Sequence, residues 1–384
     1  MKDGDSLTSW TFHNTTSIDF GRGKRKLLVS EIAGKKVLAV SSVRGKKQFL
    51  GDHILGSLAS DFMWVTSVRE NPGVVEIDET AAALKGSRFD VILAFGGGSA
   101  IDFAKALSAI LSTGPEHHNV RHVVSHPELI DSAKLIPIYA MPTTAGTGSE
   151  VTPFATVWDH DNQKKLSVFS ASLYPTRAIV DPELTDSLPS DATFASGLDA
   201  LNQAFESVWN KNNSPITKSL AARSIDLALR ALPSLMVDIT DGAARDSMAE
   251  AALLAGVCIS QTRTAICHSI SYPLTARFSV PHGIAAAFTM TEVLNRCLLN
   301  DLRLFDPIIL VTGHGSAELL RDEIGRLMSL LNVTQKVSQL TGGLEAVAGI
   351  QHEMLTSDRA GNFILQIDNE GLYQILKKSF QLER

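Results

Sequence analysis

The sequence predicts a two-domain protein, with an α/β nucleotide-binding domain over residues 1–184 and an all-helical domain over residues 185–384. Three observations support this prediction. Short apolar runs alternate with helical segments in the first half, as in a parallel sheet covered by helices. One of these runs leads directly into a glycine-rich turn. From about Thr185 onward, long segments of helical periodicity follow one another and strand-like runs nearly vanish.

Length and charge are those of an ordinary soluble enzyme. The 384 residues are enough for two domains with cores, and a formal net charge of -6 argues against a nucleic-acid partner. Membrane binding is not expected, because no apolar run reaches the roughly 18 residues of a spanning helix. The polar N-terminus lacks a signal-peptide core, and the three cysteines show no CxxC spacing. We therefore expect a cytoplasmic protein.

The expected elements follow from periodicity and turn residues. The strands of the first half are predicted at residues 36–40, 62–68, 91–95, 135–141, 155–158, 166–169 and 178–180, with the fifth and sixth forming a hairpin. The helices of the second half are predicted at residues 191–210, 215–236, 243–262, 264–276, 284–300, 314–332, 335–341, 343–355 and 369–380.

A triple-glycine turn is the strongest local signal in the first half. The strand at 91–95 enters a turn that contains Gly97, Gly98 and Ser99, and an amphipathic helix follows. Glycines let the backbone approach a phosphate, and the free amides of a helix start attract it. Asp102 lies in the first turn of this helix. The turn therefore predicts a phosphate site, although a tight strand–helix connection is the alternative.

A second loop of small residues follows the strand at 135–141. Its members Thr143, Thr144 and Thr147 offer many hydrogen-bond donors with little bulk. Such a loop suits a diphosphate, a ribose or the edge of a nicotinamide. A flexible loop without a ligand is the alternative.

The cofactor preference is predicted from the end of the strand at 36–40. An acidic residue at this place commonly holds the ribose hydroxyls of NAD. This chain instead has Ser42, Arg44 and two lysines nearby. A 2′-phosphate would be attracted to these groups, so we expect NADPH, with NADH possible. The alternative is a set of ordinary surface residues at a helix start.

Four side chains of the second half could meet at one point. Asp199 and Gln203 lie four residues apart, on one face of a predicted helix. His268 and Tyr272 have the same spacing, and His282 follows in a Pro-His-Gly segment. A carboxylate, an amide and two imidazoles are ligands for a divalent metal between helices. Alternatively, these side chains occupy unrelated positions in the core and on the surface and do not meet.

These motifs occur in the order GGGSAID, PTTAGTGSE, GLDALNQAFES, HSISYPL and PHG. In combination they resemble the iron-containing (group III) alcohol dehydrogenase family, from about residue 15 to about residue 300. The resemblance implies a dehydroquinate synthase-like fold, in which a dinucleotide-binding domain and a helical metal-binding domain flank a cleft. It also implies a homodimer.

The resemblance assigns roles residue by residue. The residues that match the family's cofactor contacts are Asn71, Gly97, Gly98, Ser99, Asp102, Thr143, Thr144, Thr147 and Lys165. Asp199, His268 and His282 match three of the four metal ligands. The chain departs at Gln203 and Tyr272, where family members carry histidine. An amide is a weaker ligand, so we expect Fe(II) or Zn(II) bound less tightly, a changed metal, or none.

Three shorter segments, at 206–210, 260–265 and 269–274, resemble the branch that reduces phosphonoacetaldehyde. The expected function is therefore metal-dependent NAD(P)H reduction of a small aldehyde or ketone, with a phosphonate-bearing substrate as the best candidate. Tyr272 would supply or relay the proton. Arg263 and Arg277 would bind the phosphonate, with structural salt bridges as the alternative.

Two other functions remain open. One is a metal-free reductase similar to maleylacetate reductases, and the other is a non-catalytic nucleotide-binding scaffold. Residues 345–384 give no clear signal, and residues 358–362 are expected to form a surface loop, with a border of the cleft as the alternative.

Overall fold

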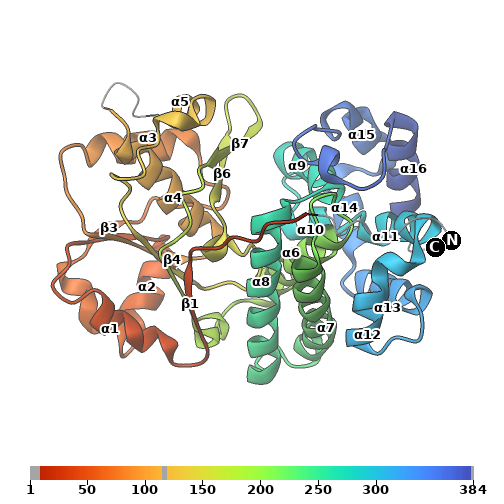
Figure 1. The fold of residues 1–384 in the computed structure, drawn as a ribbon, viewed down its shortest axis with the longest axis horizontal. Coiled ribbons are helices and arrows are strands. Elements are labelled where there is room, and N and C mark those ends of the chain that lie inside the picture. Colours follow the sequence, from red (N-terminus) through yellow and green to blue (C-terminus); the bar gives the residue numbers. More distant parts are fainter. Residues whose placement is uncertain (1–8, 115–118, 382–384) are drawn as a thin grey trace.

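The computed structural model describes residues 9–114 and 119–381, which form two halves side by side (Figure 1). The first half is built on a six-stranded sheet in the order β1-β8-β5-β4-β2-β3, and all of its strand pairs are parallel. In that order the strands are Ser17–Phe20, Arg177–Val180, Ile138–Pro142, Val91–Gly96, Val37–Val40 and Met63–Val65. The predicted α/β class of this half is confirmed.

Helices cover both faces of the sheet. Successive side chains of β4 point to opposite faces, so that Ile92 and Ala94 enter one apolar core and Leu93 and Phe95 enter another. Both faces are apolar and therefore need a cover of helices. The first core includes side chains of α3, α4 and α5, and the second includes side chains of α1 and α2. These five helices are Leu27–Glu31, Val43–Gly51, Val74–Ala83, Gly98–Ser112 and Val120–Ser125.

A separate antiparallel hairpin lies beside the sheet. Its strands, β6 (Phe154–Asp159) and β7 (Lys164–Phe169), lie where the sequence predicts them. The strand predicted at 62–68 is shorter than expected, since β3 spans only Met63–Val65.

The second half is helical, as predicted, and α6 lies in its core against α7, α8 and α10. The segment predicted as one helix over 284–300 is divided into two, because the chain turns at Phe288 and Thr289. From α6 to α16 the helices are Ser190–Val208, Pro215–Val237, Gly242–Thr262, Ile266–Phe278, His282–Ala287, Met290–Asn300, Asp306–Thr312, Ala317–Leu330, Val333–Thr341, Leu344–Gly349 and Asn369–Ser379.

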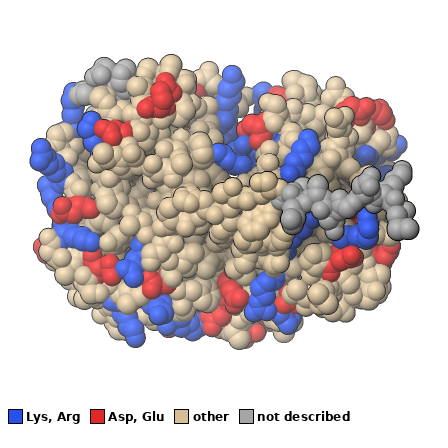
Figure 2. All heavy atoms as spheres, in the orientation of Figure 1, with Lys and Arg blue, Asp and Glu red and all other residues tan. Residues whose placement is uncertain are grey.

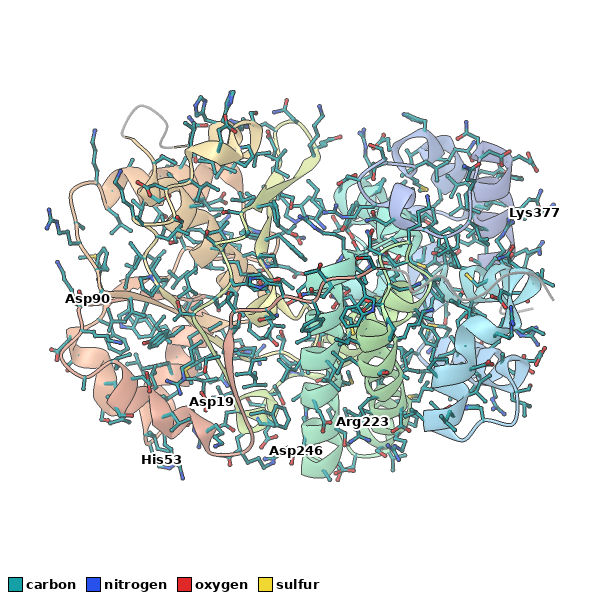
Figure 3. All side chains as sticks on the ribbon, viewed as in Figure 1. Asp19, His53, Asp90, Arg223, Asp246 and Lys377 are labelled. Atoms are coloured by element: carbon teal, nitrogen blue, oxygen red, sulfur yellow. The ribbon has the colours of Figure 1, made fainter. Side chains whose placement is uncertain are left out.

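The two halves are joined by close contacts. A Cβ atom on Gly148 would lie 2.2 Å from the Cα atom of Gly256 in α8, and Gly148 has a φ of +61°. Only glycine fits this contact, which presses the second nucleotide loop against the helical half. At the start of α8, Asp246 (Figure 3) accepts a 2.7 Å hydrogen bond from Arg22 of the first half.

The surface shows no single-sign field on the face drawn in Figure 2, where basic and acidic side chains are interspersed. Among the described residues, no helix has both the length and the apolar character that crossing a membrane requires.

Candidate active site

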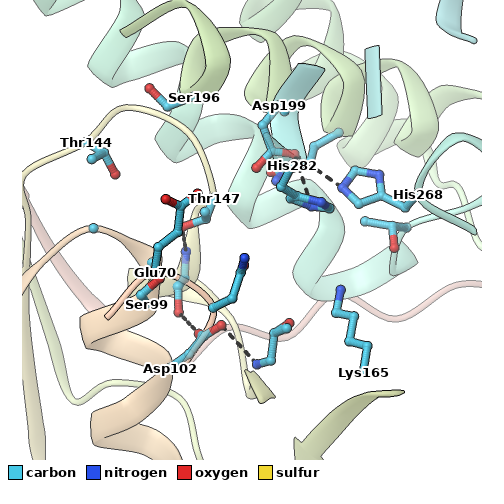
Figure 4. Close-up of a pocket in the computed structure, with 18 of the residues that line it drawn as sticks. Glu70, Ser99, Asp102, Thr144, Thr147, Lys165, Ser196, Asp199, His268 and His282 are labelled. Carbon is cyan, nitrogen blue, oxygen red and sulfur yellow. Dashed lines mark hydrogen bonds and ion pairs between the residues drawn. The ribbon is translucent and has the colours of Figure 1, made fainter. Parts of the chain in front are cut away.

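A cavity of about 340 Å³ lies between the two halves. The glycine turn and the hairpin line it on one side, and α6, α9 and α10 line it on the other (Figure 4). A second cavity of about 300 Å³ shares Gly97, Ser99 and Thr144 with the first and extends to the end of β2. Together they form a continuous space of the kind an extended dinucleotide needs.

Asp199, His268 and His282 converge in the first cavity. Figure 4 shows their side chains pointing toward one another from α6, α9 and α10. The Oδ1 atom of Asp199 lies 3.3 Å from Nε2 of His268 and 3.9 Å from Nε2 of His282. One ligand atom from each residue lies within 4.8 Å of the others. The structure thus brings together the three residues that the sequence analysis selected.

Tight packing of α10 on α6 creates this convergence. A Cβ atom on Gly283 would lie 1.8 Å from the carbonyl oxygen of Ala195, so only glycine allows the approach. The side chain of Asn202 donates a 2.5 Å hydrogen bond to the carbonyl of Ala286. Because His282 is the first residue of α10, this contact fixes its position opposite Asp199.

Glu206 orients His268. Its Oε2 atom lies 2.7 Å from Nδ1 of the imidazole, and its carboxylate also accepts the backbone N–H groups of Ala265 and Cys267 at 2.8 and 2.6 Å. Burial lowers the pKa of His268, but Glu206 and Asp199 outweigh it and raise the pKa to about 10. The sequence analysis did not select Glu206. Its place seven residues after Asp199, two turns along one helix face, was the available signal.

The donor set fits a divalent metal. Buried atoms without a hydrogen-bond partner include Oδ1 of Asp199, Oε1 of Gln203 and Nδ1 of His282. Unpaired buried oxygens are costly, and a cation among them would remove that cost. Burial lowers the pKa of His282 to about 3, and the charges of His268 and Lys165 lower it further against the effect of Asp199, so this imidazole is neutral. His268, with its raised pKa, would release a proton when a metal binds. Asp199, His268 and His282 could hold the metal, with the amide oxygen of Gln203.

The glycine turn forms a cradle with the second loop. A Cβ atom on Gly97 would lie 3.1 Å from Thr144, and one on Gly98 would lie 2.5 Å from Thr147. Gly97 is the N-cap of α4 and offers no side chain to its first amides. Those amides are free to bind a phosphate. Ser99 and Thr147 line the first cavity, and Thr143 lines the second.

Asp102 lines the same cavity, but its carboxylate is already engaged. It accepts a hydrogen bond from the hydroxyl of Ser149 and one of 2.9 Å from the backbone of Thr156. The fully buried Lys105 donates to the carbonyls of Ser149 and Phe154 at 2.5 and 2.9 Å. Both side chains therefore fix the second loop and the hairpin to α4, a role that the sequence analysis did not predict.

The predicted adenosine end is basic. Ser42 and Arg44 line the second cavity, as do Arg69 and Glu70. The Ser42 hydroxyl caps α2 by accepting the Gly45 backbone N–H at 3.0 Å. The Arg44 guanidinium donates to the carbonyl of Ser187 at 3.2 Å. Asn71 lines the first cavity instead, near the hairpin.

Tyr272 lies among cations beside the cluster. Its ring stacks on His282 with centroids 5.8 Å apart, and the Lys165 Nζ atom lies 3.3 Å from the ring centroid. The Nε atom of Arg359 lies 3.4 Å from the phenol oxygen. Burial raises the pKa of Tyr272, but the charges of Lys165, Arg359 and His268 outweigh it and lower the pKa to about 7.

The two predicted substrate arginines occupy different environments. Arg263 lines the cavity, where its guanidinium lies 4.3 Å from the Phe169 ring centroid. Arg277 is not among the residues lining either cavity. It pairs with Glu353 at 2.8 Å and donates to Gln163, so a structural salt bridge replaces its predicted contact with the substrate.

The segment at 358–362 lies at the surface as expected, but one of its residues also borders the cavity. Arg359 lies within this segment, is only 9% exposed and lines the cavity beside Tyr272. No periodicity or motif in the sequence marks this arginine, because a distant segment of the chain brings it to the site.

The fold and the residue cluster define a class of protein, in which a parallel nucleotide-binding domain faces a helical domain that carries metal-ligand residues. The chain belongs to the iron-containing alcohol dehydrogenase family. The family pattern described as iron-containing alcohol dehydrogenase matches residues 15–182, and the pattern of its C-terminal domain matches residues 193–363. The predicted family and fold are confirmed.

Two curated relatives and one solved structure illustrate the similarity. The chain is 38% identical to a phosphonoacetaldehyde reductase of Streptomyces viridochromogenes over 56% of its own length and 55% of that protein's. It is 31% identical to an NADPH-dependent butanol dehydrogenase of Clostridium saccharobutylicum over 74% of each. The crystal structure of sulfoacetaldehyde reductase from Bifidobacterium kashiwanohense in complex with NAD+ superposes with a TM-score of 0.84, at 26% identity, over 97% of this chain and 99% of that one.

Proposed function

We propose that this protein catalyses the metal-dependent, NAD(P)H-linked reduction of a small aldehyde to an alcohol, with a phosphonate-bearing aldehyde such as phosphonoacetaldehyde as its substrate. One observation carries the proposal. The Asp199, His268 and His282 cluster and the glycine turn line the same cavity. A dinucleotide held by the turn would therefore have its reactive end beside the cluster.

The residues divide the chemistry among them. A divalent metal held by Asp199, His268 and His282 would supply Lewis acidity toward a carbonyl oxygen. The threonines and glycines of the two loops hold and orient the dinucleotide, which provides the hydride. Reduction also needs one proton, and Tyr272, whose ring stacks on His282 and lines the cavity, is the group proposed to supply it. The charge of Lys165 favours its release.

The preference for an anionic substrate has two supports. Lys165, Arg263 and Arg359 all line the cavity, and such groups bind phosphonate oxygens well. Two similar proteins are named phosphonoacetaldehyde reductase and sulfoacetaldehyde reductase, and the aldehydes in these names are short and carry a charged oxyanion group.

A metal-free reductase is the second candidate, and Gln203 is the observation that favours it. The family's usual ligand at this position is replaced by a neutral amide. The buried oxygens of Asp199 and Gln203 that lack hydrogen-bond partners favour the metal-dependent reductase.

Nicotinamide oxidation with a panel of aldehydes tests the proposal. We expect NADPH consumption with phosphonoacetaldehyde, loss of activity after chelation, and recovery with Fe(II) or Zn(II). Undiminished activity in the metal-stripped protein would support the metal-free candidate. Absence of turnover with every aldehyde, with both NADPH and NADH and after metal loading, would contradict a reductase altogether.

Tyr272→Phe tests the proton donor. Loss of the hydroxyl should lower kcat by roughly 100-fold or more while KM for NADPH stays within about threefold. A kcat close to that of the unmodified protein would show that the proton comes from elsewhere.

A further inference from the structure

The segment that carries Arg359 is held at both ends. Before Arg359, the carbonyl of Met354 accepts a hydrogen bond from the Ser269 hydroxyl in α9. After it, the side chain of Asn362 donates to the Thr264 carbonyl at 2.9 Å, and Phe363 is fully buried. This surface segment is therefore fixed at both ends, and from it Arg359 reaches into the cavity.

The Arg359 guanidinium is nearly buried, and only some of its N–H groups form hydrogen bonds. Its Nε atom donates to the Tyr272 hydroxyl at 3.4 Å, and its Nη1 atom donates to Asp358 at 2.8 Å. The Asp358 side chain is 64% exposed, so this ion pair is largely screened by water. Among described residues the Nη2 atom has no hydrogen bond. This part of the guanidinium is thus free to bind a ligand in the cavity.

Arg263 provides a second free guanidinium. It lies against the rings of Phe154 and Phe169, and no hydrogen bond or ion pair joins its guanidinium to the described residues. Its backbone has a φ of +62°, a strained conformation for arginine that points to a functional role. Burial lowers the pKa of Arg263, and the neighbouring charge of Arg359 lowers it further. Both guanidiniums line the same cavity, where their like charges oppose each other.

We infer that Arg263 and Arg359 together bind a tetrahedral oxyanion, and that Arg359 determines the preference of the site for aldehydes carrying a phosphonate or sulfonate group. An oxyanion between the two guanidiniums would satisfy both and cancel their repulsion. Arg359 also donates to Tyr272, so the bound anion and the proposed proton donor share one neighbour. The inference rests on the proposed reductase function and names its substrate class.

Substrate preference tests the inference in the metal-loaded protein. The measurement is kcat/KM for phosphonoacetaldehyde, sulfoacetaldehyde and neutral propionaldehyde in the unmodified protein, Arg359→Gln and Arg359→Lys. Arg359→Gln should lower the ratio of anionic to neutral kcat/KM by roughly 10- to 100-fold, and Arg359→Lys by less. The control Arg303→Gln, at an exposed position outside the cavity, should keep the ratio. An equal fall for charged and neutral aldehydes, or a ratio within twofold of the original, overturns the inference.

Equilibrium binding separates this inference from the reductase proposal. Methylphosphonate and sulfate, titrated calorimetrically into the protein with NADP+, should bind the unmodified protein and bind Arg359→Lys more weakly. This measurement needs no turnover and remains decisive if Arg359→Gln does not fold. If neither anion binds the unmodified protein, the oxyanion site is wrong even where aldehydes are reduced. If both bind but no aldehyde is reduced, only the reductase proposal fails.

Discussion

The Nδ1 atom of His268 lies 2.7 Å from the Oε2 atom of Glu206, and both side chains are buried. The carboxylate therefore accepts a hydrogen bond from the Nδ1–H group and leaves Nε2 directed at Asp199. Carboxylates behind metal-binding histidines fix the tautomer and make the imidazole a better ligand. The backbone N–H groups that Glu206 also accepts hold this carboxylate in place.

Glu206→Gln should lower the affinity for Zn(II) or Fe(II) by roughly 10- to 100-fold, because a neutral amide polarises the imidazole less. Competition with a chromogenic chelator measures this affinity without any turnover. Glu250→Gln, a half-exposed position on α8, is the matched control and should bind metal as before. If Glu206→Gln binds as tightly as the control, the pair has only a structural role.

Gln203→His should raise metal affinity by roughly tenfold or more, about 1.4 kcal/mol, since imidazole is a stronger ligand than an amide oxygen. Gln203 lines the same cavity as the cluster, and its buried Oε1 atom has no hydrogen-bond partner, so this oxygen is free to bind a metal. The same chelator competition measures the effect, with Gln203→Ala expected to weaken binding. Equal affinities in all three proteins would exclude position 203 from the coordination shell.

Arg44→Ala should lower kcat/KM for NADPH by roughly 10- to 100-fold and change the value for NADH by less than about threefold. Arg44 and Arg69 line the cavity at the end of β2, where Ser42 stands in place of an acidic residue. Steady-state kinetics with each cofactor give the two values. Lys377→Ala, at an exposed position on α16 that lines neither cavity, should leave both unchanged. An equal fall in kcat/KM for NADH would show that Arg44 does not contact a 2′-phosphate.

Much of the fold is visible in local sequence patterns. Buried parallel strands such as 91–95 are apolar throughout, and the glycine turn follows at the one place where a phosphate site would form. Asp199, His268 and His282 stand out because each lies in a recognisable motif. The interruption of the helix predicted over 284–300 was missed, since Phe288 and Thr289 are buried and ordinary helix residues.

The parts that the sequence did not predict depend on tertiary contacts. Glu206 lies within the GLDALNQAFES motif, but its contact with His268 depends on the approach of α9 to α6. Arg359 lies 87 residues beyond Tyr272, so its place in the cavity depends on how Asn362 and Met354 hold the chain. Arg277 shows the converse, because it was predicted to bind the phosphonate and instead forms an ion pair with Glu353.

Glu150→Gln should remove a pH dependence of stability. Burial raises the pKa of Glu150 to about 7 from an ordinary value of 4.5, against the opposing charge of Lys105. Between these values the folded state holds a proton that the unfolded state has lost, so stability falls as pH rises. The raised pKa therefore favours the folded state fully below pH 4.5, and this contribution is lost as pH passes 7.

The size of this effect is on the order of 3 kcal/mol, from 1.36 kcal/mol per pKa unit. Urea unfolding at pH values from 4.5 to 8 gives the free energy of unfolding for both proteins. His268 and His282 titrate in both, so the difference between the two curves reports Glu150 together with its coupling to Lys105. That difference should change across the interval, with the unmodified protein losing more stability toward pH 8. A constant difference would mean that Glu150 is ionised in the fold throughout this range.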